Sequence, residues 1–176
     1  ITGLNRFLTG DASRVVDIRG VDPRQGNGRS RLSMPNAYDI RARVTTLERV
    51  AAFQIGRATL VEQGTATSLD VIRATSDFFA AMGQRPFLGR LFEERDDRPG
   101  AAPVVALAHQ YWERVIGSDP SVIGRTLMIG TTPHTVVGVV RPEMEAGNLA
   151  VIDLWIRIPF QRTGSPRDRS YNAVAG

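Results

Sequence analysis

Hydrophobic residues recur along the chain with two different spacings, which predicts a mixture of strands and short helices. Short apolar runs broken by Gly56 and Gly64 predict a meander of strands in the middle of the chain. Two later apolar runs joined across 130–132 predict a β-hairpin, and 151–160 alternates as a strand does. The ranges predicted as single strands are 13–20, 50–55, 58–63, 66–73 and 151–160.

Three helices are predicted from capping residues and from three- and four-residue spacing. The first begins at Ser33 as N-cap, with Pro35 near the first helical position. Its predicted buried stripe consists of Ala37, Ile40, Val44 and Leu47. In the second, Ser76 is the predicted N-cap, Asp77 lies in the first turn, and Gly83 ends the helix.

The third helix follows a buried strand within residues 104–117. Trp112 and Val115 are predicted to lie on one face of it. Asp119 and Pro120 then open a short helical turn that closes at Gly124. Residues 21–31 are polar and rich in turn formers, which predicts a loop. Because strands are adjacent in the middle and late parts of the chain, the predicted fold class is α+β rather than a repeated βαβ unit.

Composition narrows the class of protein. The 176 residues are 42% hydrophobic and 23% charged, which is typical of a globular domain with a real core. All basic residues are arginines, and they are scattered rather than gathered into a stripe, which disfavours nucleic acid as a partner. Without cysteine, the chain has no disulfide and no thiolate chemistry. No apolar run is long enough to span a bilayer, and the abrupt start at Ile1 indicates a fragment of a longer protein.

Candidate chemistry is sparse. His109 and His134 share no short metal-ligand spacing, and no nucleophile motif accompanies them, so surface or cross-strand roles are predicted for both. The acids Glu93, Glu94, Asp96 and Asp97 do not match an EF-hand, and the interleaved Arg95 and Arg98 indicate mutual neutralisation on a solvated loop. No catalytic, cofactor-binding or metal-binding residues are predicted.

Several segments, in order and spacing, resemble the MacB-like periplasmic core domain, found in permease subunits of bacterial ABC exporters. They are "LSMPNAYDIRAR", "VIRATSDFFAAMGQRPFLGRLFEERDD", the stretch from "APVVALAHQYWERV" to "VVGVVRPEM", and "DLWIRIPF". The similarity is strongest to the large permease set common in acidobacteria. The residues that carry the motifs are Phe78, Phe79, Gly83, Pro86, Gly89, Arg90, Phe92, Trp112, Asp119, Pro120, Gly124, Gly138 and Trp155.

The resemblance implies a two-lobed α+β domain with structural rather than catalytic motif residues. Phe78, Phe79 and Phe92 would be core anchors, and Arg90 would tie down a turn. The sequence departs from the family at Ala108, where serine is usual, and at Val140-Arg141-Pro142. The whole chain, 1–176, would be a fragment of this domain. The best match runs over 12–160, and 161–176 would form a partial C-terminal segment that leaves part of the periplasmic lobe missing.

In the family, such a domain lies between two membrane helices on the periplasmic face of the cytoplasmic membrane. It binds no nucleotide and transmits ATP-driven motion as a dimer. The implied partners are the rest of the permease with its transmembrane helices, a cytoplasmic ATPase, and an outer adaptor protein or exported substrate. Two alternatives remain open: a secreted hydrolase centred on His109 and the 93–97 acids, and a soluble ligand-binding lobe with a closed apolar pocket.

Overall fold

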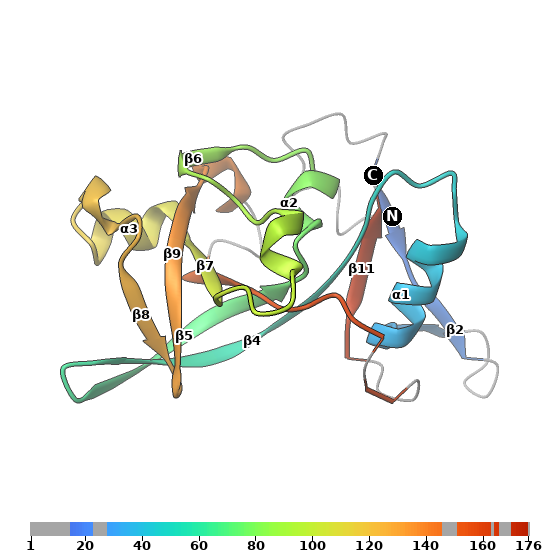
Figure 1. Cartoon of the computed structure of the whole chain (residues 1–176), viewed down its shortest axis with the longest axis horizontal. Helices are drawn as coiled ribbons and strands as arrows, with labels where there is room; N and C mark the ends of the chain where they lie inside the picture. The colour runs from blue at the N-terminus through green and yellow to red at the C-terminus, as the bar shows by residue number, and fades with distance from the viewer. Residues whose placement is uncertain (1–14, 23–27, 146–150, 163, 166–169, 176) are drawn as a thin grey trace.

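A computed structural model describes residues 15–22, 28–145, 151–162, 164–165 and 170–175 (Figure 1). Strands dominate it, with short helices between them, which confirms the α+β class. The strands are β1 (Val16–Ile18), β2 (Gly20–Asp22), β3 (Gly28–Ser30), β4 (Val50–Glu62), β5 (Thr65–Ala74), β6 (Pro86–Gly89), β7 (Val104–Leu107), β8 (Thr126–Ile129), β9 (Thr132–Val140), β10 (Leu154–Arg157) and β11 (Asn172–Ala175). The α-helices are α1 (Met34–Arg43), α2 (Phe78–Ala81) and α3 (His109–Arg114), and the 3-10 helices are η3 (Glu94–Asp97), η4 (Pro120–Val122) and η5 (Pro142–Glu145).

Six strands of the main sheet close on themselves into a small barrel. β4, β5, β10, β7 and β9 are neighbours in that order, and β8 pairs with both β9 and β4. The β4–β8 contact that closes the ring is short, with Leu60 opposite Ile129 and Val61 opposite Met128. Closure gives each of these six strands a neighbour on both sides, so the free edges at which sheets associate with other chains are left to the outer strands β1 and β6. β6 extends the sheet beyond β9, and β11 and β1 extend it beyond β4.

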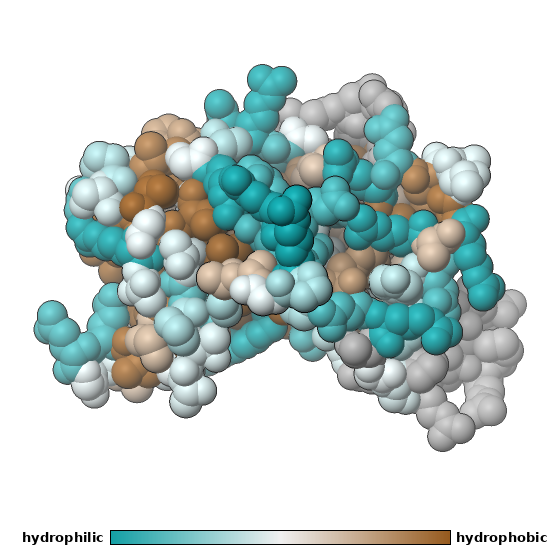
Figure 2. All heavy atoms as spheres, in the orientation of Figure 1, coloured by the Kyte–Doolittle hydropathy of each residue, from teal (hydrophilic) through white to brown (hydrophobic). Residues whose placement is uncertain are grey.

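The main hydrophobic core lies inside this barrel and beneath α2. The face drawn in Figure 2 is mostly hydrophilic, and the hydrophobic residues visible on it gather mainly at the upper left. Phe79 is almost fully buried, and its ring is 5.1 Å from that of Phe92 and 6.1 Å from that of Trp155, between centroids. Phe78 packs against Phe79 at 5.4 Å and against Phe53 at 5.2 Å. Tilted and edge-on aromatic contacts of this kind add to the stabilisation from burial alone. These rings link the short helix α2 to strands β4 and β10.

A smaller hydrophobic cluster lies under α1, on the right of the view in Figure 1. Met34 and Ala37 of α1 pack there with Ala52 of β4 and Phe160. Ser33 caps α1, because its hydroxyl accepts a hydrogen bond from the backbone N–H of Asn36 at 3.2 Å. β4 reaches both clusters, since its first residues pair with β11 and its last with β8.

The structure corrects several predicted boundaries. β4 is one continuous strand through Gly56, not two strands at 50–55 and 58–63. α1 ends at Arg43, so Val44 and Leu47 lie outside the helix and are only half-buried. The predicted loop 21–31 contributes residues to β2 and β3, which pair with each other. Residues 23–27 of that loop lie outside the described part of the chain.

Two predicted side-chain placements are also wrong. The N-cap of α2 is Asp77 rather than Ser76, and the Ser76 hydroxyl instead donates a hydrogen bond to the carboxylate of Asp97. Val115 is 57% exposed and does not share the buried position of Trp112. The C-terminal stretch also contains a strand that was not predicted, β11, which lies between β1 and β4.

Candidate functional site

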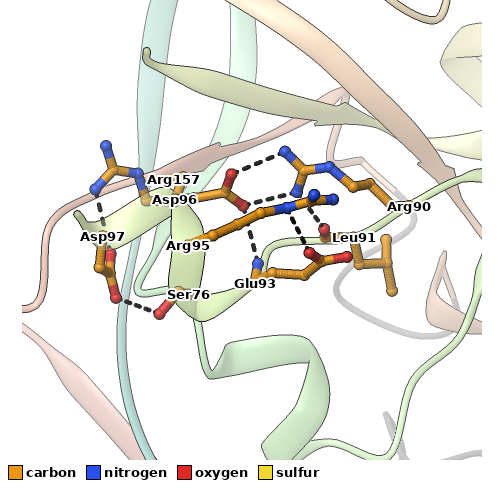
Figure 3. Close-up of polar contacts among 8 residues, drawn as sticks. All are labelled: Ser76, Arg90, Leu91, Glu93, Arg95, Asp96, Asp97 and Arg157. Atoms are coloured by element: carbon orange, nitrogen blue, oxygen red, sulfur yellow. Dashed lines mark hydrogen bonds and ion pairs between the residues drawn. The ribbon is translucent and has the colours of Figure 1, made fainter. Parts of the chain in front are cut away.

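The segment Arg90–Asp97, called here the Arg90 turn, is held by ion pairs that reach several elements (Figure 3). Arg90 donates to both carboxylate oxygens of Asp96, at 2.8 Å each, in a bidentate pair. The same guanidinium donates to the carbonyl of Leu91 at 3.0 Å. The backbone N–H of Glu93 donates to Asp96 at 2.9 Å, so the carboxylate also caps η3. Planar paired geometry of this kind is the strongest arrangement available to an arginine and a carboxylate.

Asp96 is 5% exposed, and its environment favours the charged form. Burial alone would raise the pKa of Asp96. The hydrogen bonds from Arg90 and from the Glu93 N–H oppose this effect, and the net result is a lowered pKa. Asp96 therefore stays ionised at neutral pH, as its paired partner requires.

Asp97 ties the Arg90 turn to two strands of the barrel. Its carboxylate accepts a hydrogen bond from Ser76, just after β5, and one from Arg157, at the end of β10, the latter at 3.2 Å. The side chain of Arg157 is only 10% exposed. Because β5 and β10 are parallel neighbours, Asp97 links their adjacent ends. The predicted neutralisation by Arg95 and Arg98 is therefore wrong for Asp96 and Asp97, whose partners are Arg90 and Arg157.

Replacement of Asp96 by alanine is expected to lower the free energy of unfolding by about 2–3 kcal/mol, because it leaves a half-buried guanidinium and a backbone N–H without their acceptor. Urea unfolding followed by circular dichroism measures this loss. In the wild-type protein the carboxylate's contribution is present above the pKa of an unfolded aspartate, about 3.9. It should be lost as the pH falls through the lowered pKa of Asp96.

Glu94 supplies the matched control, since it is an exposed acid in the same 3-10 helix. Glu94→Ala is expected to change the free energy of unfolding by less than about 0.5 kcal/mol. Equal losses in the two variants would show that the bidentate pair contributes nothing specific to stability.

A second group of side-chain hydrogen bonds connects α3 to η4. The indole Nε1 of Trp112 donates to the backbone carbonyl of Asp119 at 3.0 Å. The Asp119 side chain accepts hydrogen bonds from the backbone N–H of Ser121 at 2.8 Å and from its hydroxyl at 2.7 Å, and it also pairs with Arg125. The hydrogen bonds from Ser121 come first among the causes that lower the pKa of Asp119. Pro120 is the first residue of η4, and Gly124 follows that helix with a positive φ of 89°.

Two motif glycines meet where β6 crosses β9. Gly89 and Gly138 are register partners in this antiparallel pair. A Cβ atom on Gly138 would lie 1.9 Å from the carbonyl oxygen of Arg90, and one on Gly89 would lie 2.4 Å from the carbonyl oxygen of Val137. Only glycine fits such a close approach of two backbones. Pro86 starts β6, and Gly83 follows α2 with a positive φ of 63°.

The two histidines have packing partners rather than catalytic ones. His109 lies edge-on to Phe87, with ring centroids 4.5 Å apart, and its Nδ1 is 3.5 Å from Glu113 one helical turn away. His134 is buried in β9 opposite Leu127, with Nδ1 at 3.0 Å from the Thr132 carbonyl. Burial is the main cause that lowers the pKa of His134, so its ring is neutral at pH 7.

The hydrolase alternative required His109 and the acids of residues 93–97 to share one site, and no contact between them is found among the described residues. The contacts of His109 are with Phe87, Trp112 and Glu113, whereas the acids of the Arg90 turn contact arginines and Ser76. Within the described residues, no group of three or more histidine, aspartate or glutamate side chains is placed to hold a metal ion.

The ligand-binding alternative would need an enclosed apolar pocket. One hollow lies beside α1, with a volume of about 260 Å³, and is lined by Met34, Pro35, Ile158, Pro159, Gly164, Ser165 and Tyr171. Another, of about 470 Å³, lies next to the start of β6 and is lined in part by arginine side chains. Both are open to solvent rather than enclosed.

Comparison with known proteins points to one family. Residues 1–175 match the family described as the MacB-like periplasmic core domain. A macrolide export ATP-binding/permease protein, MacB 2 of Aeromonas hydrophila, is 32% identical over 92 residues, which cover 51% of this chain and 14% of that protein. The pyoverdine export ATP-binding/permease protein PvdT of Pseudomonas entomophila is 26% identical over 126 residues, covering 69% of this chain and 19% of that protein. The chain thus spans less than a fifth of the length of these relatives.

Solved structures share the fold. The periplasmic region of MacB from Actinobacillus actinomycetemcomitans superposes with a TM-score of 0.64 at 17% identity, covering 99% of this chain and 78% of that one. The extracellular domain of the ABC-type transporter YknZ from Gram-positive bacteria gives 0.59 at 15% identity, covering 92% and 82%. In the part of the chain that the structure describes, no helix is long and apolar enough to cross a bilayer. With a family match over nearly its full length, this chain belongs to the MacB-like periplasmic core domain family.

Proposed function

We propose that the chain is a non-catalytic domain of an ABC-type export permease, held outside the cytoplasmic membrane on its periplasmic face. Its work is mechanical: it passes motion driven by ATP hydrolysis elsewhere in the transporter to an exported substrate or an outer partner. The observation that carries the proposal is the family match over residues 1–175.

The strand pairing supports a mechanical role. β4 runs for 13 residues, about 43 Å at the usual rise per residue, and pairs with β11 near its start and with β8 near its end. Motion applied to the β1–β11 side therefore reaches the barrel through a continuous ladder of hydrogen bonds. The Arg90 turn further ties the ends of β5 and β10 together through Asp97. A domain built this way moves as a unit rather than deforming locally.

The partners follow from this proposal. The transmembrane helices of the permease would carry the domain, a cytoplasmic ATPase would bind nucleotide, and a second copy of the domain would complete the transporter. An outer adaptor protein or the exported substrate would contact the periplasmic surface. Neither a cofactor nor a nucleic acid has a part in this mechanism.

The proposal is tested in the full-length permease assembled with its ATPase in vesicles. Replacing residues 1–175 by a flexible Gly/Ser linker should abolish substrate export and retain basal ATP hydrolysis, because the motion no longer reaches the substrate. Full export without the domain would overturn the proposal.

His109→Ala serves as the matched control in the same assay, and export is expected to stay close to the wild-type rate. The side chain packs against Phe87 and pairs with Glu113, so its loss affects local packing only. Complete loss of export in a variant whose circular dichroism spectrum is unchanged would instead indicate chemistry at His109. Hydrolysis of ester or peptide substrates by the purified chain would indicate the same.

A further inference from the structure

Two arginines line one pocket next to the start of β6. The pocket has a volume of about 470 Å³ and is lined by Gly83, Gln84, Arg85, Arg141 and Glu143. Pro86 of β6 pairs with Val140 of β9 in antiparallel register. Arg85 comes directly before Pro86, and Arg141 comes directly after Val140. Because the strands are antiparallel, the two arginines lie at the same end of the β6–β9 pair.

These two guanidinium groups differ from most others in the described chain. Nine arginines make ion pairs with carboxylates there: Arg19, Arg41, Arg49, Arg57, Arg90, Arg95, Arg125, Arg157 and Arg162. Arg85 and Arg141 are exposed and make no ion pair within the described residues. Their donors are therefore available to a ligand.

The side chains that line this pocket carry more positive than negative charge. Like charges opposite each other at the ends of neighbouring strands repel, and neither arginine makes an ion pair within the described residues. Glu143 lines the same pocket, yet it makes no ion pair with either arginine. The pocket has free space beside Gly83, since a Cβ atom on this residue would meet no neighbour within 4 Å. An anion seated between the two guanidinium groups would remove the repulsion.

We propose that the pocket between Arg85 and Arg141 binds a phosphate group. A phosphate carries its oxygens on a tetrahedral centre, so it can accept paired hydrogen bonds from two guanidinium groups that approach it from different sides. The formal charges of Arg85, Arg141 and Glu143 sum to +1, which one phosphodiester neutralises. The phosphate could be free or carried by a lipid headgroup, because both present the same oxygens to the arginines. This binding property goes beyond the proposed transport role and does not depend on it.

The test uses the 176-residue chain at pH 7 and low ionic strength, where screening is weak. Inorganic phosphate is titrated by calorimetry against the wild type, R85A and R141A. Each substitution should weaken phosphate binding by about tenfold, because each removes charge-assisted hydrogen bonds. E143Q should strengthen binding, since it removes the one negative charge that lines the pocket.

Arg98 supplies the matched control, because it is exposed and its side chain makes no ion pair within the described residues. R98A removes the same charge as R85A and should leave phosphate affinity within about twofold of the wild type. Sedimentation with phosphatidylglycerol vesicles separates the two sources of phosphate. Co-sedimentation that R85A and R141A abolish supports a lipid headgroup, whereas phosphate binding without co-sedimentation supports a free phosphate. No heat of phosphate binding, equal weakening by R98A, or equally tight binding of acetate would overturn the proposal.

Discussion

Replacing Trp112 by alanine should lower the free energy of unfolding by about 3–5 kcal/mol. The indole is 8% exposed, packs 5.5 Å from the ring of Phe87, and donates its N–H to the carbonyl of Asp119. Truncation removes this packing and leaves a cavity between α3 and η4. It also leaves the Asp119 carbonyl without its indole donor. Urea unfolding reports the loss, and Trp155, the other of the two tryptophans, remains as a fluorescent probe.

Val115 provides the control for this prediction, because it is the C-cap residue of the same helix but is 57% exposed. Val115→Ala should change the free energy of unfolding by less than about 0.5 kcal/mol. If Trp112→Ala lowered the free energy of unfolding by less than about 1 kcal/mol, the indole would contribute little to the packing of α3.

Local sequence signals predicted the kinds of elements better than their extents. Ser33 and Pro35 specify the start of α1 through groups within one turn, so this helix start was predictable. Gly56 suggested a break in β4, yet the strand continues because Gly56 is paired with Val71 of β5. β11 had no signal of its own. Its four residues form a strand because β1 and β4 lie on either side of it.

The partners of the acidic residues in the Arg90 turn could not all be predicted from the sequence. Arg95 and Arg98 stood nearest to the acids in sequence and were expected to neutralise them. Asp97 instead pairs with Arg157, 60 positions away, because the ends of β5 and β10 bring that arginine to η3. Ser76 had the right chemistry for an N-cap, but its hydroxyl is used by Asp97. Arg95 does pair with Glu93, as expected, but long-range pairing, which no local pattern encodes, decided the contacts of Asp97 and Ser76.

Arg90 is held from two sides, which links the ion-pair network to the glycines of β6 and β9. Its guanidinium is fixed by Asp96, and its backbone N–H donates to the Val137 carbonyl at 2.9 Å. Its own carbonyl oxygen lies against Gly138. The position of the turn therefore depends on how closely the backbone of β9 can approach it.

Gly138→Ala should lower the free energy of unfolding by at least about 3 kcal/mol, because the new methyl group would overlap a backbone atom that cannot move alone. An ideal Cβ at this position lies 1.9 Å from the Arg90 carbonyl oxygen and 2.9 Å from that of Leu88. Relief requires β6 to separate from β9, which breaks their hydrogen bonds and displaces the buried Asp96 pair. Thermal and urea unfolding measure the loss, and hydrogen exchange should show reduced protection in β6.

Gly56→Ala separates this steric effect from the general effect of replacing a strand glycine. A Cβ on Gly56 would meet only the end of the Arg73 side chain, at 3.2 Å, and that side chain can move. Its cost should stay below about 1 kcal/mol, and the substitution also restricts the unfolded chain, which favours the folded state. If Gly138→Ala were as mild as Gly56→Ala, β6 and β9 would have room to separate at little cost. The Arg90 turn would then be mobile rather than fixed in place by β9.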